Sequence, residues 1–464
     1  MYDKTDYRGL KVCRLTPMAY IRRTANSVHL LQSPINLKTR KLLFAFLLLA
    51  NAFGLHSAEV PLEYSNRVYE DPIRTVLFYQ QTSNGNTPVI SLGSGESMML
   101  EFDEMKATND FYMYTLIHCD ANWQPSSINK FQTISGMGFE NINDFFFSNS
   151  TTIQYTHYRA QVPGPQTQPR ISGNYLLLVY RNHNEQDIVL TRRFMVLDLK
   201  GRLEVSTMPA TQVQYRFKRQ EVDFHFTVNP GYTIPNPYQD LKTQVWQNNN
   251  WETAIPLKPL FIMGNRYSFD YQEGNTFNGL NEYRFFDIRS LRRLSFNIRE
   301  KYDEDGQKHA VVNFEPNRAF STYVQYADFN GRMVIQNMDG TGSSVTESDY
   351  VWTHFTLKAD EPLPNGQQVY VWGELSDWQL KDRMRMHWNE ALKAYECTAL
   401  LKQAYYNYMF AVDKGDGLAD PTVFEGTHAN TENTYQVAVY HRNQSMGYDE
   451  LIAFENRSTL SGQR

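Results

Sequence analysis

The feature that most limits what this chain can fold into is a repeated alternation of apolar and polar side chains. In VDFHFTV, residues 222–228, Val, Phe, Phe and Val fall on one face and Asp, His and Thr on the other, which is the period-two pattern of a half-buried strand. Similar segments recur along the chain between turns such as SNGN, VPGPQTQP and LPNG, and no long amphipathic helix competes with them. Aromatic residues make up 14% of the chain, which suits pleated surfaces. The pattern predicts an all-β protein built of stacked antiparallel β-sandwich domains.

The length and the pauses in this pattern predict the domain organisation. A chain of 464 residues is too long for one core and should form about three domains. The strand pattern relaxes at LKGRLEVSTMP, near residue 200, and at NMDGTGSSVTESD, residues 337–349. We therefore expect immunoglobulin-like β-sandwich modules at residues 59–199, 200–336 and 337–445, followed by a last strand and a frayed tail at 446–464.

Residues 1–58 differ from the rest of the chain. They carry nine Lys or Arg and two Asp, and they contain the apolar run LLFAFLLLA from Leu42 to Ala50. A basic stretch before a short apolar segment is typical of a secretory signal peptide, and this run is too short to anchor the protein in a bilayer. We expect residues 1–58 to be a leader with a cleaved signal peptide, and the mature protein to be exported and not inserted in the membrane.

The charge balance excludes one large class of partners. Without the leader, the 45 basic and 50 acidic side chains fall to 36 and 48, a formal net charge of −12. Nucleic-acid binding requires a basic face that displaces counterions. We therefore expect no nucleic-acid partner.

The stretch HCDANW, residues 118–123, places His118, Cys119 and Asp120 side by side. Strict alternation sends His118 and Cys119 to opposite faces of a strand, so a straight strand does not let both bind one metal. His118 and Asp120 share a face, so the carboxylate could orient the imidazole as a catalytic base. However, no GxSxG, HExxH or CxxC motif supplies a nucleophile or a metal site. The favoured interpretation is packing: Asp120 and Asn122 cap a turn with side-chain hydrogen bonds, and Trp123 folds back over the sheet.

Other candidate sites are weak. GSGES (93–97) and GTGSS (340–344) lack the Gly-Lys-Ser/Thr ending of a phosphate loop, and YDEDG (302–306) resembles half a calcium loop without its bidentate glutamate. A solvated hairpin tip explains YDEDG as well as calcium does. Two cysteines beyond the leader, Cys119 and Cys397, provide no disulfide framework, and whether they pair is left open. We predict no catalytic, cofactor-binding or metal site.

Several long motifs resemble those of a known family. SLGSGESMMLEFDEM, YTLIHCDANWQPSSI, FFFSNSTTIQYTHYRAQVP, SGNYLLLVYR with TRRFMVLD, GLNEYRFFDIRSLR (279–292), and EGTHANTENTYQVAVYHR with YDEL (448–451) occur in the order seen in the plug proteins of the bacterial type IX secretion system. The resemblance implies a periplasmic protein without enzymatic activity that binds the periplasmic opening of a very large outer-membrane translocon barrel and closes it. The signature residues are expected to be structural: His118, Cys119, Asp120, Trp123, Asn281, Glu282, Arg284, Asp287, Tyr448 and Asp449.

The third module has a second resemblance, to early-set immunoglobulin-like domains that include glycogen-binding modules. Gly373 and Trp378 match the strand, Gly, turn and Trp pattern of those modules, and Trp378 would be the first glycan platform. However, Met409 stands where the ligand-binding lysine would be, and the loop KGDG (414–417) lacks the second tryptophan. A carbohydrate-binding protein of the cell envelope is therefore the alternative function, and the favoured role of Trp378 is packing against Trp372 or Trp388.

Overall fold

In the computed structural model, residues 61–80 and 87–462 are described, and they belong to one compact unit that begins at Val60. The predicted signal peptide lies outside the described residues. The fold is all-β, as expected, with strands arranged in three β-sandwiches and only short helices between them.

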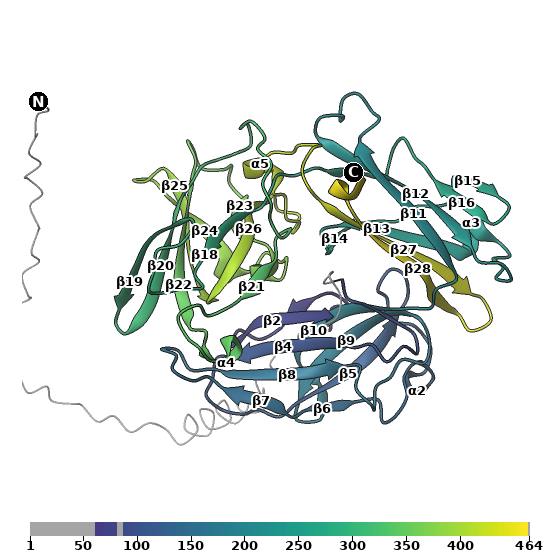
Figure 1. Cartoon of the computed structure of the whole chain (residues 1–464), viewed down its shortest axis with the longest axis horizontal. Coiled ribbons are helices and arrows are strands. Elements are labelled where there is room, and N and C mark those ends of the chain that lie inside the picture. Colours follow the sequence, from purple (N-terminus) through teal and green to yellow (C-terminus); the bar gives the residue numbers. More distant parts are fainter. Residues whose placement is uncertain (1–60, 81–86, 463–464) are drawn as a thin grey trace, which may run out of the picture. The chain divides into compact units, whose positions relative to one another are not determined.

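The first sandwich is formed by two sheets. One sheet has the order β1-β10-β9-β5-β6, with the short β3 parallel to β10, and the other has the order β2-β4-β8-β7 (Figure 1). Its elements are β1 (Arg67–Val68), β2 (Ile73–Gln80), β3 (Val89–Ser91), β4 (Met98–Glu104), β5 (Tyr112–Cys119), α2 (Lys130–Thr133), β6 (Glu140–Ile142), β7 (Asp144–Phe147), β8 (Thr156–Val162), β9 (Gly173–Arg181) and β10 (Asn184–Leu197). Strands β5 and β9 are apolar on both faces because one face fills the core of this sandwich and the other packs outside it.

The middle sandwich also has two sheets, of order β11-β12-β16-β15 with β17 beside β12, and β14-β13-β27-β28. Its elements are β11 (Gly201–Pro209), β12 (Arg219–Val228), α3 (Pro237–Asp240), β13 (Leu241–Gln247), β14 (Asn250–Ile255), β15 (Phe261–Met263), β16 (Arg266–Phe269), β17 (Thr276–Asn278), β27 (Thr434–Asn443), β28 (Tyr448–Ser458) and η3 (Thr459–Gly462). The alternation in β12 is confirmed, since Val222, Phe224, Phe226 and Val228 all lie in the core of this sandwich.

The third sandwich is one nine-stranded sheet folded on itself, of order β18-β26-β23-β24-β25-β22-β20-β19 with β21 beside β26. Its elements are β18 (Arg284–Asp287), β19 (Ile298–Glu304), β20 (Gln307–Glu315), β21 (Met333–Ile335), α4 (Ser344–Glu347), β22 (Tyr350–Lys358), β23 (Gln368–Trp372), η1 (Glu374–Ser376), η2 (Asp382–Met384), β24 (Arg385–Asn389), β25 (Ala394–Lys402), β26 (Ala404–Asp413) and α5 (Thr422–Glu425). Strands β20 and β22 are parallel, and the others are antiparallel. The stretch YDEDG forms the tip of the β19–β20 hairpin.

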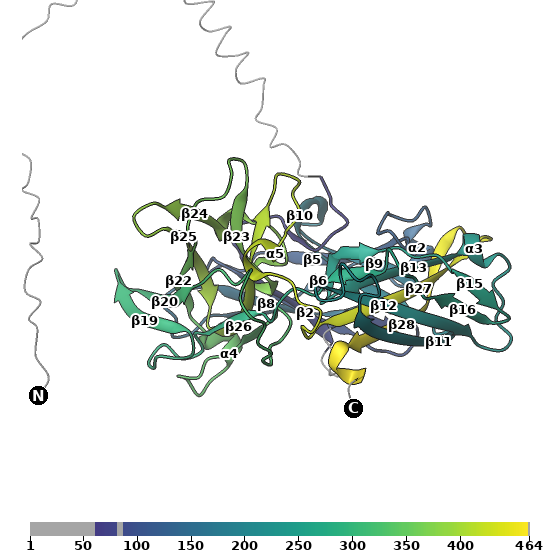
Figure 2. The ribbon, with the colours of Figure 1, turned by 90° about the horizontal axis from the view of Figure 1, so that it is seen from above.

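The strand pairing differs from the expected module boundaries at 336 and 445. Strands β18 to β20, expected in the middle module, pair within the third sandwich, and β27 and β28, expected in the third module and the tail, complete the middle sandwich. Figures 1 and 2 show the yellow β27 and β28 among the teal strands β11 to β13. The reason is that Val437, Val439 and Ile452 fit the apolar core beside β13. The chain therefore crosses from the middle to the third sandwich and back.

Candidate functional site

The HCDANW stretch forms a tight turn at the end of β5. The Asp120 Oδ1 atom accepts hydrogen bonds from the backbone N–H groups of Asn122, at 2.8 Å, and Gln124, at 2.9 Å. Asn122 does not cap this turn as expected, because its Oδ1 atom accepts a 3.0 Å hydrogen bond from Gln244 in β13. The turn therefore holds the first sandwich against the middle one.

The His118 side chain is buried beneath this turn. Its Nδ1 atom lies 2.9 Å from Ser126 Oγ and its Nε2 atom lies 3.2 Å from the Ser172 carbonyl oxygen. Burial lowers the pKa of His118 to about 4. The imidazole is therefore neutral at pH 7, and both ring nitrogens have partners other than Asp120, an arrangement that suits packing better than base catalysis.

Trp123 does not fold back over its own sheet as expected. Its ring packs edge-on against Trp251 of β14, with centroids 5.0 Å apart, and the Arg193 guanidinium lies over it at 4.8 Å. Cys119 belongs to the same cluster, which contains buried side chains of both the first and the middle sandwich. Trp123 lies in the tight turn after β5 with a backbone φ of 62°, and its ring packs against the middle sandwich. Cys119 and Cys397 are both buried and free, so they do not pair.

The YDEL stretch at the start of β28 meets HCDANW across this junction. The Asp449 Oδ2 atom accepts a 3.0 Å hydrogen bond from the Ala121 N–H and lies 2.8 Å from Lys242 Nζ. Burial alone would raise the pKa of Asp449, but these two partners hold it below its usual value. The Tyr448 ring packs edge-on against His118 at 5.5 Å.

Gly173 allows this close contact between the two motifs. Its φ of +133° is a conformation that side chains rarely adopt, and a Cβ atom there would lie 2.6 Å from His118 Nε2 and 3.0 Å from the Asp449 carbonyl oxygen. Two motifs about 330 residues apart thus form one junction, which we call the motif junction: the buried contacts of His118, Cys119, Ala121 and Trp123 with Trp251, Tyr448 and Asp449.

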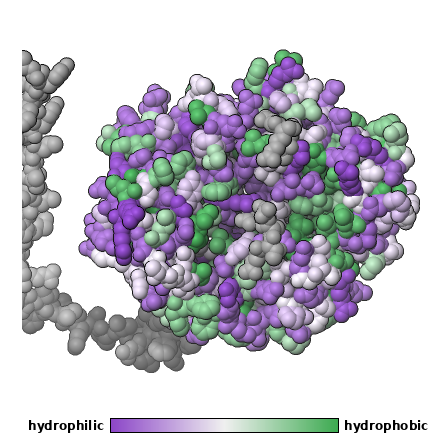
Figure 3. Space-filling model, viewed as in Figure 1, coloured by the Kyte–Doolittle hydropathy of each residue, from purple (hydrophilic) through white to green (hydrophobic). Residues whose placement is uncertain are grey.

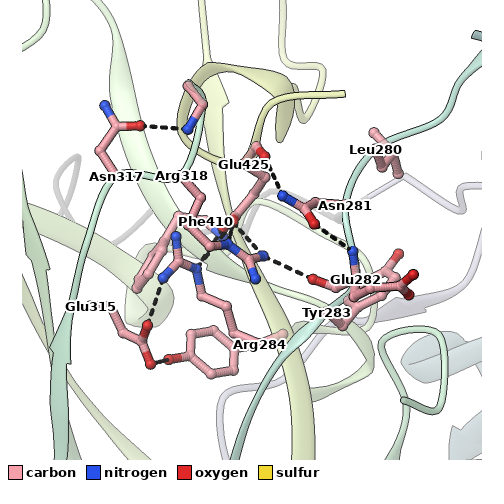
Figure 4. Close-up of polar contacts among 12 residues, drawn as sticks. Leu280, Asn281, Glu282, Tyr283, Arg284, Glu315, Asn317, Arg318, Phe410 and Glu425 are labelled. Atoms are coloured by element: carbon pink, nitrogen blue, oxygen red, sulfur yellow. Dashed lines mark hydrogen bonds and ion pairs between the residues drawn. The ribbon is translucent and has the colours of Figure 1, made fainter. Parts of the chain in front are cut away.

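The third motif, NEYR, supplies a buried ion-pair network (Figure 4). The Arg284 guanidinium is 2% exposed and pairs with Glu425 at 3.0 Å and with Glu315 at 2.6 Å, above the ring of Phe410. Arg318 makes a second pair with Glu425 at 2.6 Å. Two arginines compensate the fully buried Glu425 carboxylate and hold its pKa below the usual value despite desolvation.

Asn281 and Glu282 connect this network to the chain crossing between the middle and third sandwiches. Asn281 Nδ2 donates a 2.8 Å hydrogen bond to the Glu425 carbonyl oxygen, and the Glu282 carboxylate accepts a hydrogen bond from Tyr323. Asp287, which is buried, instead pairs with the partly exposed Arg289 at 2.7 Å. The motif therefore stabilises the crossing, and none of Asn281, Glu282, Arg284 and Asp287 lines the large cleft described below.

A further buried polar network, which sequence reasoning missed, joins the first and third sandwiches. Lys402 Nζ in β25 lies 2.7 Å from Asp103 Oδ2 in β4, and the other oxygen of Asp103 lies 2.8 Å from His157 Nδ1. Arg192 in β10 pairs with Asp377 of the third sandwich at 2.6 Å. Asp103, His157 and Arg192 lie within the quoted motifs, but their spacing gives no sign of pairing, because their partners Lys402 and Asp377 belong to another sandwich.

Trp378 is packed, as preferred, although against Trp372 and not Trp388. The two rings are edge-on at 4.8 Å, and Tyr283 contacts Trp378 from another side at 6.0 Å. Met409, at the position of the glycan-binding lysine, is fully buried. These contacts leave Trp378 half-buried at the edge of a cleft.

The cleft has a volume of about 1070 Å³ and is lined by all three sandwiches. The first contributes residues 63–71, Trp123 and Arg193, the middle contributes 249–253, and the third contributes 377–383 and 417–419. Within residues 61–80 and 87–462, no group of three or more His, Cys, Asp and Glu side chains could hold a metal ion. Nor does this part of the chain contain a helix long and apolar enough to cross a membrane.

The surface carries many separate apolar side chains. Val213, Phe217, Phe296 and Phe320 are 75–100% exposed, whereas the largest fully buried side chains are mostly tyrosines. Figure 3 shows green and purple residues interleaved on one face of the molecule.

Comparisons with known proteins agree with this architecture. Residues 73–198 match the family model described as the type 9 secretion system plug protein 1st domain, a range that begins with β2 and ends just after β10. The first sandwich is therefore similar to the first domain of the plug proteins. The crystal structure of a hypothetical protein from Parabacteroides merdae ATCC 43184 matches with a TM-score of 0.81 and 30% sequence identity, over 86% of this chain and 100% of that one.

This chain belongs to the same family as the Parabacteroides protein. The match extends well beyond the plug-protein first domain and requires the middle and third sandwiches as well. A search of curated proteins found no match. HCDANW lies inside the matched residues 73–198, whereas its partners Trp251 and Asp449 lie outside them, so the motif junction connects the matched region to the rest of the chain.

Proposed function

We propose that this protein is a non-enzymatic periplasmic plug that binds and seals the periplasmic opening of the outer-membrane translocon barrel of the type IX secretion system. The observation that carries the proposal is the match of residues 73–198 to the first domain of the plug proteins. The leader with its basic stretch and apolar run supports export to the periplasm.

The way in which the sandwiches are joined supports a sealing role. A stopper for a wide pore must keep its shape, so its parts have to be held together by specific contacts. The motif junction joins the first and middle sandwiches, the Asp103–Lys402 pair joins the first and third, and the Arg284 network stabilises the crossing between the middle and third. We interpret the signature residues as the elements that make the three sandwiches one rigid body.

The surface supports binding by many weak contacts. Single exposed side chains such as Phe217 and Phe320 offer anchors spread over different loops, and such contacts can be released together when cargo arrives. The thiols of Cys119 and Cys397 and the His118 imidazole, which could serve as nucleophile and base, are buried.

Affinity purification tests the proposal. The tagged mature protein is recovered from its native cell envelope in mild detergent, and the proteins that come with it are identified by mass spectrometry. The proposal predicts one very large outer-membrane barrel in near-stoichiometric amount. Recovery of the protein alone, or with a polysaccharide, would contradict it.

A further inference from the structure

The cleft between the three sandwiches has properties of a binding site, although no sequence motif predicts it. Its volume of about 1070 Å³ is at the upper end of the range for ligand sites. It exists only in the assembled protein, because each wall comes from a different sandwich.

Two sheet edges border this cleft. Strand β1, at the edge of the first sandwich, pairs only with β10, and β14, at the edge of the middle sandwich, pairs only with β13 among the described strands. Edge strands present backbone N–H and C=O groups that an added strand can pair with. The cleft therefore suits an extended polypeptide better than a compact small molecule.

The lining is acidic. It holds seven carboxylates and four basic side chains. Each basic side chain already faces an acid: Arg67 faces Glu63, Arg193 faces Glu252 at 3.9 Å, Lys381 faces Asp377, and Arg383 faces Asp71 at 3.9 Å. Arginines outside the lining pair with further acids: Arg181 with Glu70, Arg192 with Asp377 and Arg385 with Asp382. A ligand therefore meets negative charge mainly at the exposed carboxylates of Glu252 and Asp382, to which Lys and Arg side chains are complementary.

Exposed acids and apolar side chains lie together in the cleft. The Glu252 and Asp382 side chains are 61% and 87% exposed, and Asp382 has only a loose contact with Arg385, at 3.5 Å. Leu418 is 58% exposed, and Tyr69 and Trp378 are half-buried, so apolar contacts and cation–π contacts are available beside the carboxylates.

From this combination we propose that the cleft binds an extended segment of the translocon barrel that carries Lys or Arg beside apolar side chains. The inference rests on the proposed plug function and names the surface and the partner segment used. The exposed carboxylates beside two edge strands favour a basic polypeptide over a neutral glycan.

Charge reversal tests the cleft. Glu252→Lys/Asp382→Lys is compared with Glu185→Lys/Asp303→Lys, whose acids are similarly exposed, pair with a single lysine each, and lie outside the cleft. In affinity purification, the amount of barrel recovered with the cleft variant should fall by about tenfold or more relative to the wild type, because like charges at an interface are strongly unfavourable. The control variant should retain wild-type amounts, and the melting temperatures of all three should agree.

A photo-crosslinking residue at position 418 identifies the occupant. We expect a crosslink to a basic segment of the barrel, reduced by Glu252→Lys/Asp382→Lys. If the wild-type protein recovers no barrel, the proposed plug function fails. If the wild type recovers the barrel and both variants recover as much of it, the plug function is retained and the cleft inference is overturned. A crosslink from position 418 to a glycan would also overturn the cleft inference.

Discussion

Lys402 and Asp103 form an ion pair in which both side chains are no more than 2% exposed, although they belong to different sandwiches. Tyr350 donates a hydrogen bond to the same carboxylate oxygen at 2.7 Å, and the Lys402 ammonium lies 4.3 Å from the centroid of the Tyr155 ring. The free-energy cost of removing two charges from water offsets much of the free energy of their attraction. Such a pair therefore adds little net stability, and its main effect is to favour one docking geometry of the two sandwiches.

Lys402→Met should therefore lower the free energy of unfolding strongly, by about 3 to 5 kcal/mol, because it leaves a buried carboxylate without its cation. Asp103→Asn/Lys402→Met should recover part of this loss, because an amide needs no counterion. Lys414→Met is the control, since Lys414 pairs with Asp420 at the surface and should matter by less than about 1 kcal/mol. Urea unfolding measures all three, and equal values for Lys402→Met and Lys414→Met would refute the prediction.

His118 should make stability depend on pH. Its folded-state pKa of about 4 lies below the ordinary value of 6.5, so the unfolded chain binds a proton that the folded protein does not, and the contribution is lost as the pH falls through this window. The wild type should lose up to about 3 kcal/mol between pH 7 and pH 4 on this account. His118→Gln should show a smaller loss over the same range.

The exposed His387→Gln serves as the control for this measurement. It should keep the wild-type pH dependence in urea unfolding. An identical pH dependence in His118→Gln and the wild type would mean that His118 is not the group responsible.

Gly173→Ala should weaken the motif junction. The new Cβ atom would lie 2.6 Å from His118 Nε2 in a backbone conformation with φ of +133°, so both strain and a clash are expected, at about 2 kcal/mol or more. Gly231 also has a positive φ, but a Cβ atom there would meet nothing within 4 Å. Gly231→Ala therefore measures the cost of backbone strain alone, about 1 kcal/mol. Thermal melting should rank wild type above Gly231→Ala and Gly231→Ala above Gly173→Ala, and the reverse order of the two variants would reject the steric account.

Arg284→Lys should be costly although the charge is kept. The guanidinium contacts Glu425, Glu315 and the Pro316 carbonyl oxygen at once, and a lysine cannot reproduce this planar fork. We expect a loss of about 2 to 4 kcal/mol from the unmade charged hydrogen bonds. Arg289→Lys, at the partly exposed pair with Asp287, should cost less than about 1 kcal/mol. A similar loss of unfolding free energy at both positions in urea unfolding would contradict the role of the buried guanidinium contacts.

Much of the fold could be predicted from local patterns. The alternation of Val222, Phe224 and Phe226 identifies a strand with one core face, and Asp120 followed by Asn122 predicts the turn that ends β5. The same patterns do not say which core a face belongs to. Val437 and Val439 would suit either the middle or the third sandwich, and only packing against β13 decides between them.

The candidate site was less accessible to sequence reasoning. Asp103 and Lys402 look like surface residues of two separate strands, and their burial arises only when the sandwiches dock. Likewise, Trp251 and Leu418 line one cleft although no spacing in the sequence relates them. Trp123 was recognised as a packing residue, but its partner Trp251 lies in another sandwich, so its direction could not be predicted.

The central claim is that this protein seals a pore, and a leak assay tests it most directly. The purified translocon barrel is reconstituted in liposomes loaded with a small fluorophore, and efflux is measured with and without the mature protein on the side of the periplasmic opening. The account predicts that efflux stops at stoichiometric protein, and that Glu252→Lys/Asp382→Lys restores it while Glu185→Lys/Asp303→Lys does not. Unchanged efflux at a concentration that saturates binding would contradict it.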